Sequence, residues 1–293
     1  MERSQTSQGN RTSTVLGRRL GGELTKHRLA AGLTQGQAAK VISASTGKIA
    51  RMESGWVPMR DPDIRILCEL YEVSDPAAVG GLLELARVDR ERRKAKGWWN
   101  EFPDLGDMRE YVTLENAATT IRTWQLSFVP GLLQTPAYVR ALVQGNSARR
   151  HTDGGRRIVA TRLARQQRLT DEDPLFLWAV IHESALRHLV GGAAVMCEQL
   201  TSLTEAAQRP NVKIQVLPFV CGEHAGMGGT FNIISFAEPG AMDVVYTETA
   251  LGQLWVEGGE GASQHDRLFE GLAESALSPA DSVSFMNTLR KEM

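Results

Sequence analysis

The sequence has few cysteines and no long apolar run, and each absence excludes a class of protein. Cys68, Cys197 and Cys221 lie far apart and form no CxxC pair, which argues against a disulfide framework or a zinc knuckle. No apolar run approaches the roughly 20 residues that cross a bilayer, so we expect no membrane role. Residues 1–14 are polar, lack the apolar centre of a secretory signal and indicate a disordered tail. We therefore expect a cytoplasmic protein.

Net charge is also nearly absent, but it is unevenly distributed. The 293 residues carry a formal charge of -1. Residues 1–100 hold 17 Lys+Arg and 11 Asp+Glu, or +6, whereas residues 101–293 hold 16 and 23, or -7. The length suggests two domains. A basic first part joined to an acidic second part is typical of a DNA-binding module fused to a domain of another kind.

The first part of the chain predicts five short helices in succession. The first, from Val15 to Ala31 with Gly32 as its stop, is indicated by apolar residues at near-helical spacing, namely Leu16, Leu20, Leu24 and Leu29. Thr34 and Gln37 have the spacing of a capping box and predict the start of the second helix, whose inward residues are Ala38, Val41 and Ile42. The fourth helix has an apolar stripe, and the fifth begins near Asp75 and Pro76.

The stretch STGKIARMESG, residues 45–55, predicts the third helix. Ser45 is a suitable N-cap, Ile49 and Met52 face the core, and Gly55 ends the helix. The exposed side then holds Thr46, Gly47, Lys48 and Arg51. Taken alone, a helix of this kind is in most cases ordinary core packing, and Lys48 alone is usually a solvated surface charge. The order and capping of all five helices together favour DNA binding.

The phrase GLTQGQAAKVISASTGKIARMESG resembles the phage-repressor-like (Xre, or Cro/C1-type) helix-turn-helix family, over about Leu16 to Val73. The likeness rests on the LTQ entry, on Ala39 where two helices cross closely, on Ile49 as core anchor and on the ESG exit. It implies that Gln35 contacts the phosphate backbone or a base edge. It also implies that the third helix faces the major groove, so that the candidate DNA-binding residues are Gln35, Ser45, Thr46, Gly47, Lys48 and Arg51.

Two further implications concern the framework of this module. The resemblance suggests that Arg28 and Glu53 form a pair tying the first helix to the third, the alternative being two independent surface charges. Gly47 has no side chain to read a base, and Ser43 stands where members of the family often have a turn glycine. If Ser43 has a positive φ, it carries a small conformational cost.

The second part of the chain predicts an α+β domain. The apolar run LFLWAVI predicts a buried strand, and the alternation in VKIQVLPF, FNIISFA and, more weakly, MDVVYTE predicts three more. Residues 109–144 predict a helix, a short extended segment, a Pro-Gly turn and a helix entered at Thr135-Pro136. Further helices are expected at about 155–169, near 183–189 and 193–208, and after Ser278, which is its N-cap. We therefore predict an all-α five-helix helix-turn-helix domain followed by a larger α+β domain. The predicted boundaries are 1–14 for the tail, 15–80 for the helix-turn-helix, 81–97 for a helical linker and 98–293 for the α+β domain.

The second domain also carries a resemblance, through FVPGLLQTPAYVRAL, VMCEQLTSLTEAAQRPNVKIQVLPF and HAGMGGTFNIISF. These stretches are similar to the antitoxin-like C-terminal domain of many actinobacterial Xre-type regulators of development or secondary metabolism. The resemblance implies control by a small companion protein. The run VPGLLQT is either a turn with core leucines or the rim of a partner surface, and the residues alone leave both interpretations open.

The sequence contains no strong motif of a catalytic site. In HESALRH the histidines lie six apart, unlike those of HExxH, so zinc hydrolysis is not expected. GEHAGMGGTF leads into a strand and not a helix, so we interpret it as a mobile loop or lid in which Gly226, Gly228 and Gly229 permit unusual dihedrals. The alternative is that it borders a ligand pocket. Glu183, His224 and Glu248 either converge in a pocket or lie scattered on the surface. We predict no catalytic, cofactor-binding or metal-ligating residue.

The sequence thus predicts a transcriptional regulator of the Xre family that binds a double-stranded DNA operator. A homodimer would require a pseudo-palindromic operator with half-sites about 10 base pairs apart or a multiple of it. The favoured control is by a companion protein. The alternatives are a small-molecule ligand in the second domain and an enzyme domain tethered to DNA.

Overall fold

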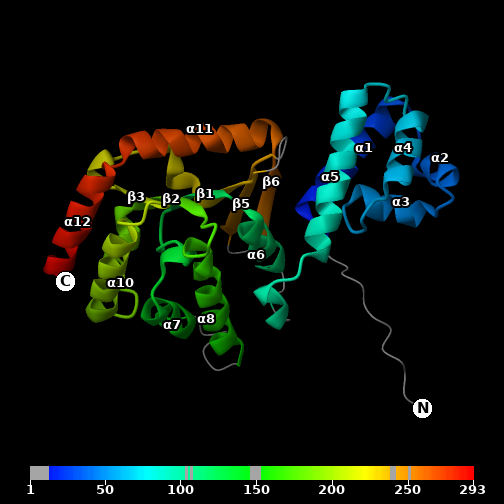
Figure 1. Cartoon of the computed structure of the whole chain (residues 1–293). Coiled ribbons are helices and arrows are strands. Elements are labelled where there is room, and N and C mark those ends of the chain that lie inside the picture. Colours follow the sequence, from blue (N-terminus) through cyan, green and yellow to red (C-terminus); the bar gives the residue numbers. More distant parts are fainter. Residues whose placement is uncertain (1–12, 103–104, 106–107, 146–152, 238–241, 250–251) are drawn as a thin grey trace, which may run out of the picture. The chain divides into compact units, whose positions relative to one another are not determined.

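The computed structural model describes residues 13–102, 105, 108–145, 153–237, 242–249 and 252–293. Most of the predicted tail, residues 1–12, lies outside this description. The chain divides into two compact units, residues 1–96 and 97–293 (Figure 1). The first unit is entirely helical and the second combines helices with one sheet, so the predicted fold class is confirmed. No helix of the described residues is both long and apolar enough to span a membrane.

The first unit contains five helices: α1 (Val15–Ala30), α2 (Gln35–Val41), α3 (Thr46–Glu53), α4 (Asp61–Leu70) and α5 (Pro76–Lys94). Side chains just before α1, α2, α3 and α5 accept hydrogen bonds from backbone N–H groups of the first turn, whereas α4 has no side-chain cap. Thr34 and Gln37 form the predicted capping box of α2, and the Ser45 hydroxyl accepts the N–H of Lys48 at the start of α3. Asp75 caps α5 by accepting two N–H groups. Local sequence signals therefore fix where these helices begin.

The core of the first unit contains most of the predicted apolar residues, including Leu20, Leu24, Ile49 and Met52. Two predictions were wrong. Leu29 is 63% exposed, because five residues after Leu24 the helix has turned about 140° away from the buried side. Val41 is 41% exposed, because it lies about 100° around α2 from the centre of the arc that faces the core.

Two connections of the first unit have notable geometry. Ser43, between α2 and α3, has a φ of 51°, the left-handed conformation in which glycine is strain-free. The segment predicted as a linker, 81–97, continues α5 as far as Lys94 and buries Leu82 and Ala86 in the core of the first unit. The Asp89 carboxylate accepts hydrogen bonds from the Thr14 hydroxyl at 2.5 Å and from Arg93 at 2.8 Å. The second half of α5 is thus part of the framework of this unit.

The second unit is built on a six-stranded sheet in the order β3-β2-β1-β4-β5-β6. The strands are β1 (Thr120–Gln125), β2 (Phe176–His182), β3 (Val212–Leu217), β4 (Phe231–Ser235), β5 (Val244–Thr249) and β6 (Gly252–Glu257). β1, β2 and β3 are parallel, whereas β4, β5 and β6 continue the sheet antiparallel. The four predicted strands are β2, β3, β4 and β5, β1 is the short extended segment expected before the Pro-Gly turn, and β6 was not predicted.

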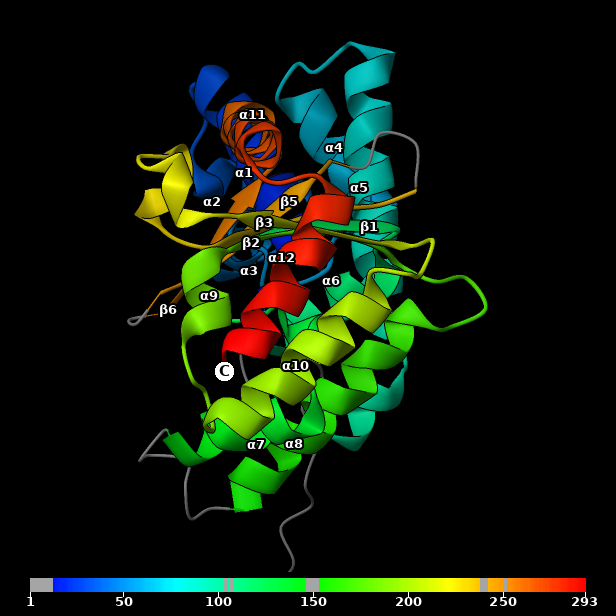
Figure 2. The same ribbon diagram turned by 90° about the vertical axis from the view of Figure 1, so that its left-hand side faces the viewer.

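Helices cover both faces of this sheet (Figures 1 and 2). One face carries α11 (Gly259–Ser275), which the sequence analysis also missed, and its Phe269 and Leu272 pack on Val180 and Ile233. The other side holds α7 (Pro136–Gly145), α8 (Asp153–Gln166) and α10 (Ala193–Ala206). The remaining α-helices of the unit are α6 (Met108–Ala117), α9 (Glu183–Arg187) and α12 (Pro279–Glu292).

Candidate DNA interface and second-unit groove

The exposed face of α3 presents four of the six predicted DNA-binding residues. Ile49 and Met52 are buried, whereas Ser45, Thr46, Gly47 and Arg51 are exposed to solvent. A Cβ added at Gly47 would meet no atom within 4 Å, so the backbone of α3 is directly accessible at this point. The surface is therefore convex, accessible and supported by an apolar core, which suits insertion into a major groove.

Lys48, the fifth predicted residue, contacts another helix of the same unit. Its Nζ lies 3.5 Å from Oδ2 of Asp63, in the first turn of α4. The buried Asp63 carboxylate also accepts two hydrogen bonds from Arg60, at 3.0 and 3.2 Å. The charge of Lys48 is thus partly neutralised within the fold, which distinguishes it from Arg51.

Gln35, the sixth predicted residue, is held by Glu53 at the C-terminal end of α3. Its Nε2 donates a 2.7 Å hydrogen bond to Oε2 of Glu53. Arg28 of α1 donates to both Glu53 oxygens, from Nε at 2.6 Å and from Nη2 at 2.9 Å, which confirms the predicted pair. Arg28 also donates to the Leu33 carbonyl at 2.9 Å. One carboxylate therefore joins α1, α2 and α3.

The electrostatics of this network keep both members of the pair ionised. Burial opposes ionisation of Glu53, but the hydrogen bonds from Arg28 and Gln35 outweigh it and hold the pKa of Glu53 below its usual value. The hydrogen bond from Arg28 to Glu53 raises the pKa of Arg28 in turn. The orientation of Gln35 thus depends on an ionised carboxylate.

Gly21 of α1 brings the same two helices into close approach. A Cβ added at Gly21 would lie only 2.1 Å from the backbone oxygen of Glu53 and 2.7 Å from its Cα. A side chain here would force α3 away from α1, since backbone atoms cannot yield as a flexible side chain can. The C-terminal end of α3 is therefore fixed by both packing and charge.

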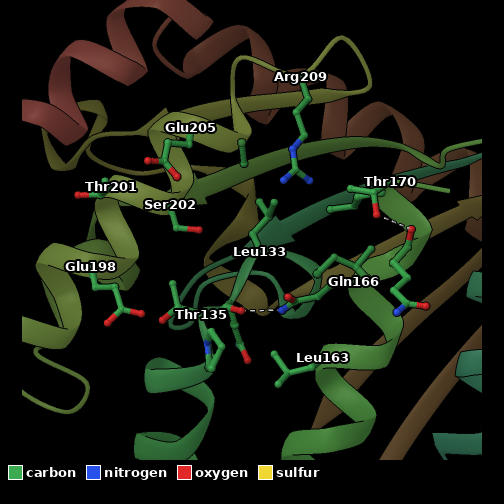
Figure 3. A pocket seen from close by; sticks show the side chains of 16 residues that line it. Leu133, Thr135, Leu163, Gln166, Thr170, Glu198, Thr201, Ser202, Glu205 and Arg209 are labelled. Atoms are coloured by element: carbon green, nitrogen blue, oxygen red, sulfur yellow. Dashed lines mark hydrogen bonds between the residues drawn. The ribbon is translucent and has the colours of Figure 1, made fainter.

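The second unit contains an open groove of about 650 Å³ between α8, α10 and the segment before α7 (Figure 3). Leu133 and Leu163 supply apolar surface, whereas Thr201, Ser202 and Glu205 of α10 supply polar atoms. Arg209, just beyond α10, points its guanidinium into the groove in Figure 3. Apolar surface with a few polar groups is typical of small-molecule sites.

The VPGLLQT run forms one wall of this groove and is held by hydrogen bonds from buried glutamine side chains. Gln199 of α10 donates to the Leu133 carbonyl and accepts from the N–H of Thr135, each at 2.7 Å. The Gln134 side chain donates to the Val129 carbonyl at 2.8 Å and accepts from Arg162. Leu132 and Leu133 are buried. The core interpretation of the leucines therefore holds, and sequence patterns gave no sign of the glutamine contacts.

A second buried Arg–Glu pair joins α6 to α8. Arg165 donates from Nε and Nη2 to the two oxygens of Glu115, both at 2.7 Å, and lies 5.0 Å from the centre of the Tyr111 ring. Glu115 is 1% exposed. Burial raises the pKa of Tyr111 well above its usual value. This pair links α6 to α8 within the second unit.

Two histidines lie with Trp124 and Phe219 at the end of the sheet where the parallel strands β1, β2 and β3 finish. The rings of His182, at the end of β2, and His224 lie 5.2 Å apart and both contact Trp124. Burial lowers the pKa of both histidines. We give the name strand-end surface to five exposed apolar residues in the segments that follow these strands: Phe128, Leu189, Phe219, Val220 and Met227.

The glycine-rich loop differs from its prediction. Of the three glycines named for unusual dihedrals, Gly229 has a positive φ, 140°, but Gly226 and Gly228 do not. Gly226 is required for space, since a Cβ there would lie 2.6 Å from the Trp124 ring. Glu183 accepts hydrogen bonds from the Phe219 N–H and from Arg187, and Glu248 lies exposed on β5. Among the described residues, no three His, Cys, Asp or Glu side chains are arranged to hold a metal ion.

The capped helices and the exposed third helix define a helix-turn-helix DNA-binding protein, and comparison with family models supports this class. A model described as a helix-turn-helix domain matches residues 19–80. The model described as domain of unknown function DUF5753 matches residues 108–288, and the chain belongs to this family. Neither the search of curated proteins nor that of solved structures found a match. The protein is thus a DNA-binding regulator by class.

Proposed function

We propose that the protein is a sequence-specific transcriptional regulator of the Xre type, which acts in the cytoplasm and binds its operator through α3. The observation that carries the proposal is the exposed face of Ser45, Thr46, Gly47 and Arg51 above the buried Ile49 and Met52. Arg51 is the candidate base reader, because an arginine pairs bidentately with guanine. Thr46 contacts a base edge or methyl group, and Ser45 contacts phosphate.

Gln35 and Lys48 have narrower roles in this proposal. Because Glu53 holds the Gln35 amide, Gln35 meets the DNA backbone in a fixed orientation, which positions α3. Lys48 exchanges its contact with Asp63 for a phosphate when DNA binds, and therefore contributes affinity more than discrimination. No covalent chemistry is required, and we propose no enzymatic role.

The first test is Arg51→Ala. We expect operator binding to weaken by about 1–3 kcal/mol and sequence preference to relax. Binding is measured on the operator and on random DNA at fixed salt, with operators obtained by selection from a random library. Arg65→Ala is the matched control, since Arg65 is an exposed arginine on α4. Equal losses on operator and random DNA would show that Arg51 reads no base.

The second unit controls the regulator through a small companion protein in this proposal. The strand-end surface supports the interpretation, because clustered exposed apolar side chains mark protein-binding sites. Val220 is 91% exposed and lies next to Phe219. Val220→Asp should abolish co-purification of the companion and leave DNA binding of the isolated protein unchanged. Retention of the companion by this variant would place its site elsewhere.

The groove favours a second candidate, control by a small molecule. A ligand that fits it combines an apolar body with an anionic group facing Arg209. A bound ligand should raise the melting temperature, and Arg209→Ala should remove that rise. Screening ligands by melting temperature with the wild type and with Arg209→Ala distinguishes binding in the groove from adventitious binding elsewhere.

The proposed DNA-bound form is a homodimer on a pseudo-palindromic operator. Two-fold assembly doubles the contact surface and sets the half-site spacing at about 10 base pairs or a multiple of it. Footprinting of a selected operator reports this spacing directly. A single uninterrupted site with one protein bound would contradict the homodimer.

A further inference from the structure

The two edge strands of the sheet in the second unit differ in whether other segments of the chain cover them. At the β3 edge, Val212, Ile214 and Val216 are buried, and the segment leading into α12 bonds to the outward backbone groups of Val216. The Leu277 N–H donates to the Val216 carbonyl, and the Val216 N–H donates to the Ser282 hydroxyl, each at 2.9 Å. At the other edge, no strand of the described residues pairs with the outer side of β6. The sheet therefore has one closed and one open edge.

The register of β5 with β6 identifies the backbone groups that face outward. The Gly258 N–H donates to the Asp243 carbonyl at 3.1 Å, so Asp243 and Gly258 form a hydrogen-bonded pair. The next residues along the two strands, Val244 and Glu257, lie opposite each other. Hydrogen-bonded pairs alternate along an antiparallel ladder. Leu254 therefore bonds to β5, whereas the backbone groups of Gln253 and Trp255 point away from it.

The β6 strand lacks the features that protect an edge. Residues 252–257, GQLWVE, contain no proline and no lysine, which are the residues that commonly prevent strand addition. Leu254 in the middle of the strand is 56% exposed. Trp255 is anchored on the opposite face, with its ring 4.6 Å from that of Tyr246. The β6 edge is thus held in place by Trp255, exposes the apolar Leu254 at its centre and can pair with another strand.

We propose that β6 pairs antiparallel with β6 of a second copy of this chain. In the pairing we assign, Gln253 of each copy exchanges backbone hydrogen bonds with Trp255 of the other. Leu254 then lies directly opposite Leu254 of the second copy, on the two-fold axis. A non-hydrogen-bonded pair of this kind brings the two Cα atoms to about 4.5 Å and buries both leucines.

Two observations favour a second copy over another strand-shaped partner. Because the β3 edge is closed, each chain has one open edge among the described residues, and self-pairing ends at a dimer instead of growing into a fibre. The paired residues Gln253, Leu254 and Trp255 are uncharged, so the two-fold arrangement places no like charges opposite each other. The inference rests on the homodimer of the proposed function and assigns its surface.

The test uses the full chain without DNA, so its result is independent of operator binding. We expect sedimentation to give a dimer for the wild type, and Leu254→Lys or Leu254→Glu to weaken dimerisation by roughly tenfold or more through like-charge repulsion. An equimolar mixture of these two variants should restore dimers, which also shows that both fold. Leu29→Lys is the control, since Leu29 is similarly exposed on α1.

A cross-link tests the register. Leu254→Cys should form a disulfide-linked dimer on mild oxidation, because the two Cα atoms would lie within disulfide range. The wild type, oxidised in parallel, reports any cross-link through Cys68, Cys197 or Cys221. The proposal is overturned by a monomeric wild type, or by a dimer that the charged substitutions do not weaken and the Leu254→Cys variant does not cross-link. Dimers that bind no operator would instead overturn the proposed function.

Discussion

The two units each contain a bidentate Arg–Glu pair, and the pairs differ in what depends on them. Arg28–Glu53 and Arg165–Glu115 have similar bond lengths, between 2.6 and 2.9 Å. Glu53 retains 11% side-chain exposure and also binds Gln35, whereas Glu115 has 1%. The first pair therefore orients a candidate DNA-contacting residue. The second is enclosed, and its hydrogen bonds join α6 to α8.

Two Arg–Glu pairs with similar hydrogen-bond lengths can therefore differ in the free-energy cost of losing the carboxylate. The two arginine side chains are similarly buried, 9% exposed for Arg165 and 8% for Arg28, so the carboxylates make the difference. Loss of the enclosed Glu115 leaves the charge of a buried guanidinium uncompensated. A pair at the edge of the core is partly solvated after the same loss. Disruption of Arg165–Glu115 should therefore affect folding, whereas disruption of Arg28–Glu53 should affect both folding and DNA binding.

The largest effect is expected for Glu115→Ala. Removing this carboxylate strands the buried Arg165 charge and should destabilise the second unit by about 3–5 kcal/mol. Hydrogen exchange read by peptide should show the loss in α6 and α8, with α1 to α5 unchanged. The double variant Glu115→Ala, Arg165→Met should recover part of the stability, because no charge then remains buried. A loss below about 1 kcal/mol would contradict burial of the pair.

The next effect is expected for Glu53→Gln, at about 1.5–3 kcal/mol in the first unit. Because the pKa of Glu53 is lowered on folding, its contribution is complete above the unfolded pKa of about 4.3. It is lost as the pH falls through the folded value. Wild-type stability should therefore decline on acidification below this pH, and the variant should show a flatter profile. Identical profiles would reject the ionised Glu53 as the cause.

Glu53→Gln should also weaken operator binding at neutral pH, because Gln35 loses its charged partner. Glu115→Ala provides the matched control at a temperature where both variants are folded. If Glu115→Ala weakened operator binding by the same factor as Glu53→Gln, the effect would come from general destabilisation and not from Gln35.

A smaller effect is expected for Gly47→Ala. The added methyl group meets open space and reduces the entropy of the unfolded chain, so the first unit should gain about 0.5–1 kcal/mol. Operator affinity should fall, since the methyl group occupies volume that DNA fills in the proposed complex. Thermal unfolding and binding titrations measure the two changes. A stabilised variant with unaltered affinity would show that DNA does not approach Gly47.

The smallest effect is expected for Arg87→Ala on α5. Arg87 contacts Glu84 and Glu91 in the same helix, and all three side chains are largely solvated. Pairs of this kind are screened by water and salt. The denaturation midpoint should remain at the wild-type value at moderate salt. A clear loss of stability would mean that exposure is a poor guide to the strength of Arg–Glu pairs in this protein.

Sequence patterns predicted the first unit more completely than the second. The cap signals at Thr34, Ser45 and Asp75 act within three residues, so they can be recognised without knowledge of the fold. The Arg28–Glu53 pair came from a family resemblance instead of from spacing. Val41 and Leu29 were misplaced because apolar character alone does not give the direction of a side chain.

The second unit depends on contacts that sequence patterns do not encode. Gln199 reaches Leu133 across 66 positions, and Arg165 reaches Glu115 across 50. β6 was missed because it follows β5 closely in the chain and alternates weakly. α11 was missed because Gly258, Gly259 and Gly261 at its start are typical of loops. For the candidate DNA-binding residues, sequence patterns and the family resemblance supplied the set. The structure shows that Lys48 and Gln35 contact other side chains of the unit, whereas the other four are exposed to solvent.

The close approach at Gly21 has an evolutionary consequence. Because α3 is anchored to α1 through its last residue and its inner face, substitutions at 46, 47 and 51 leave these anchoring contacts intact. If these positions read the operator as proposed, duplicated copies of such a gene can acquire new operators by changes on one solvent-facing surface, while the glycines of the close approach, Gly21 and Gly55, are retained. Divergence of regulatory circuits would then proceed without loss of the scaffold.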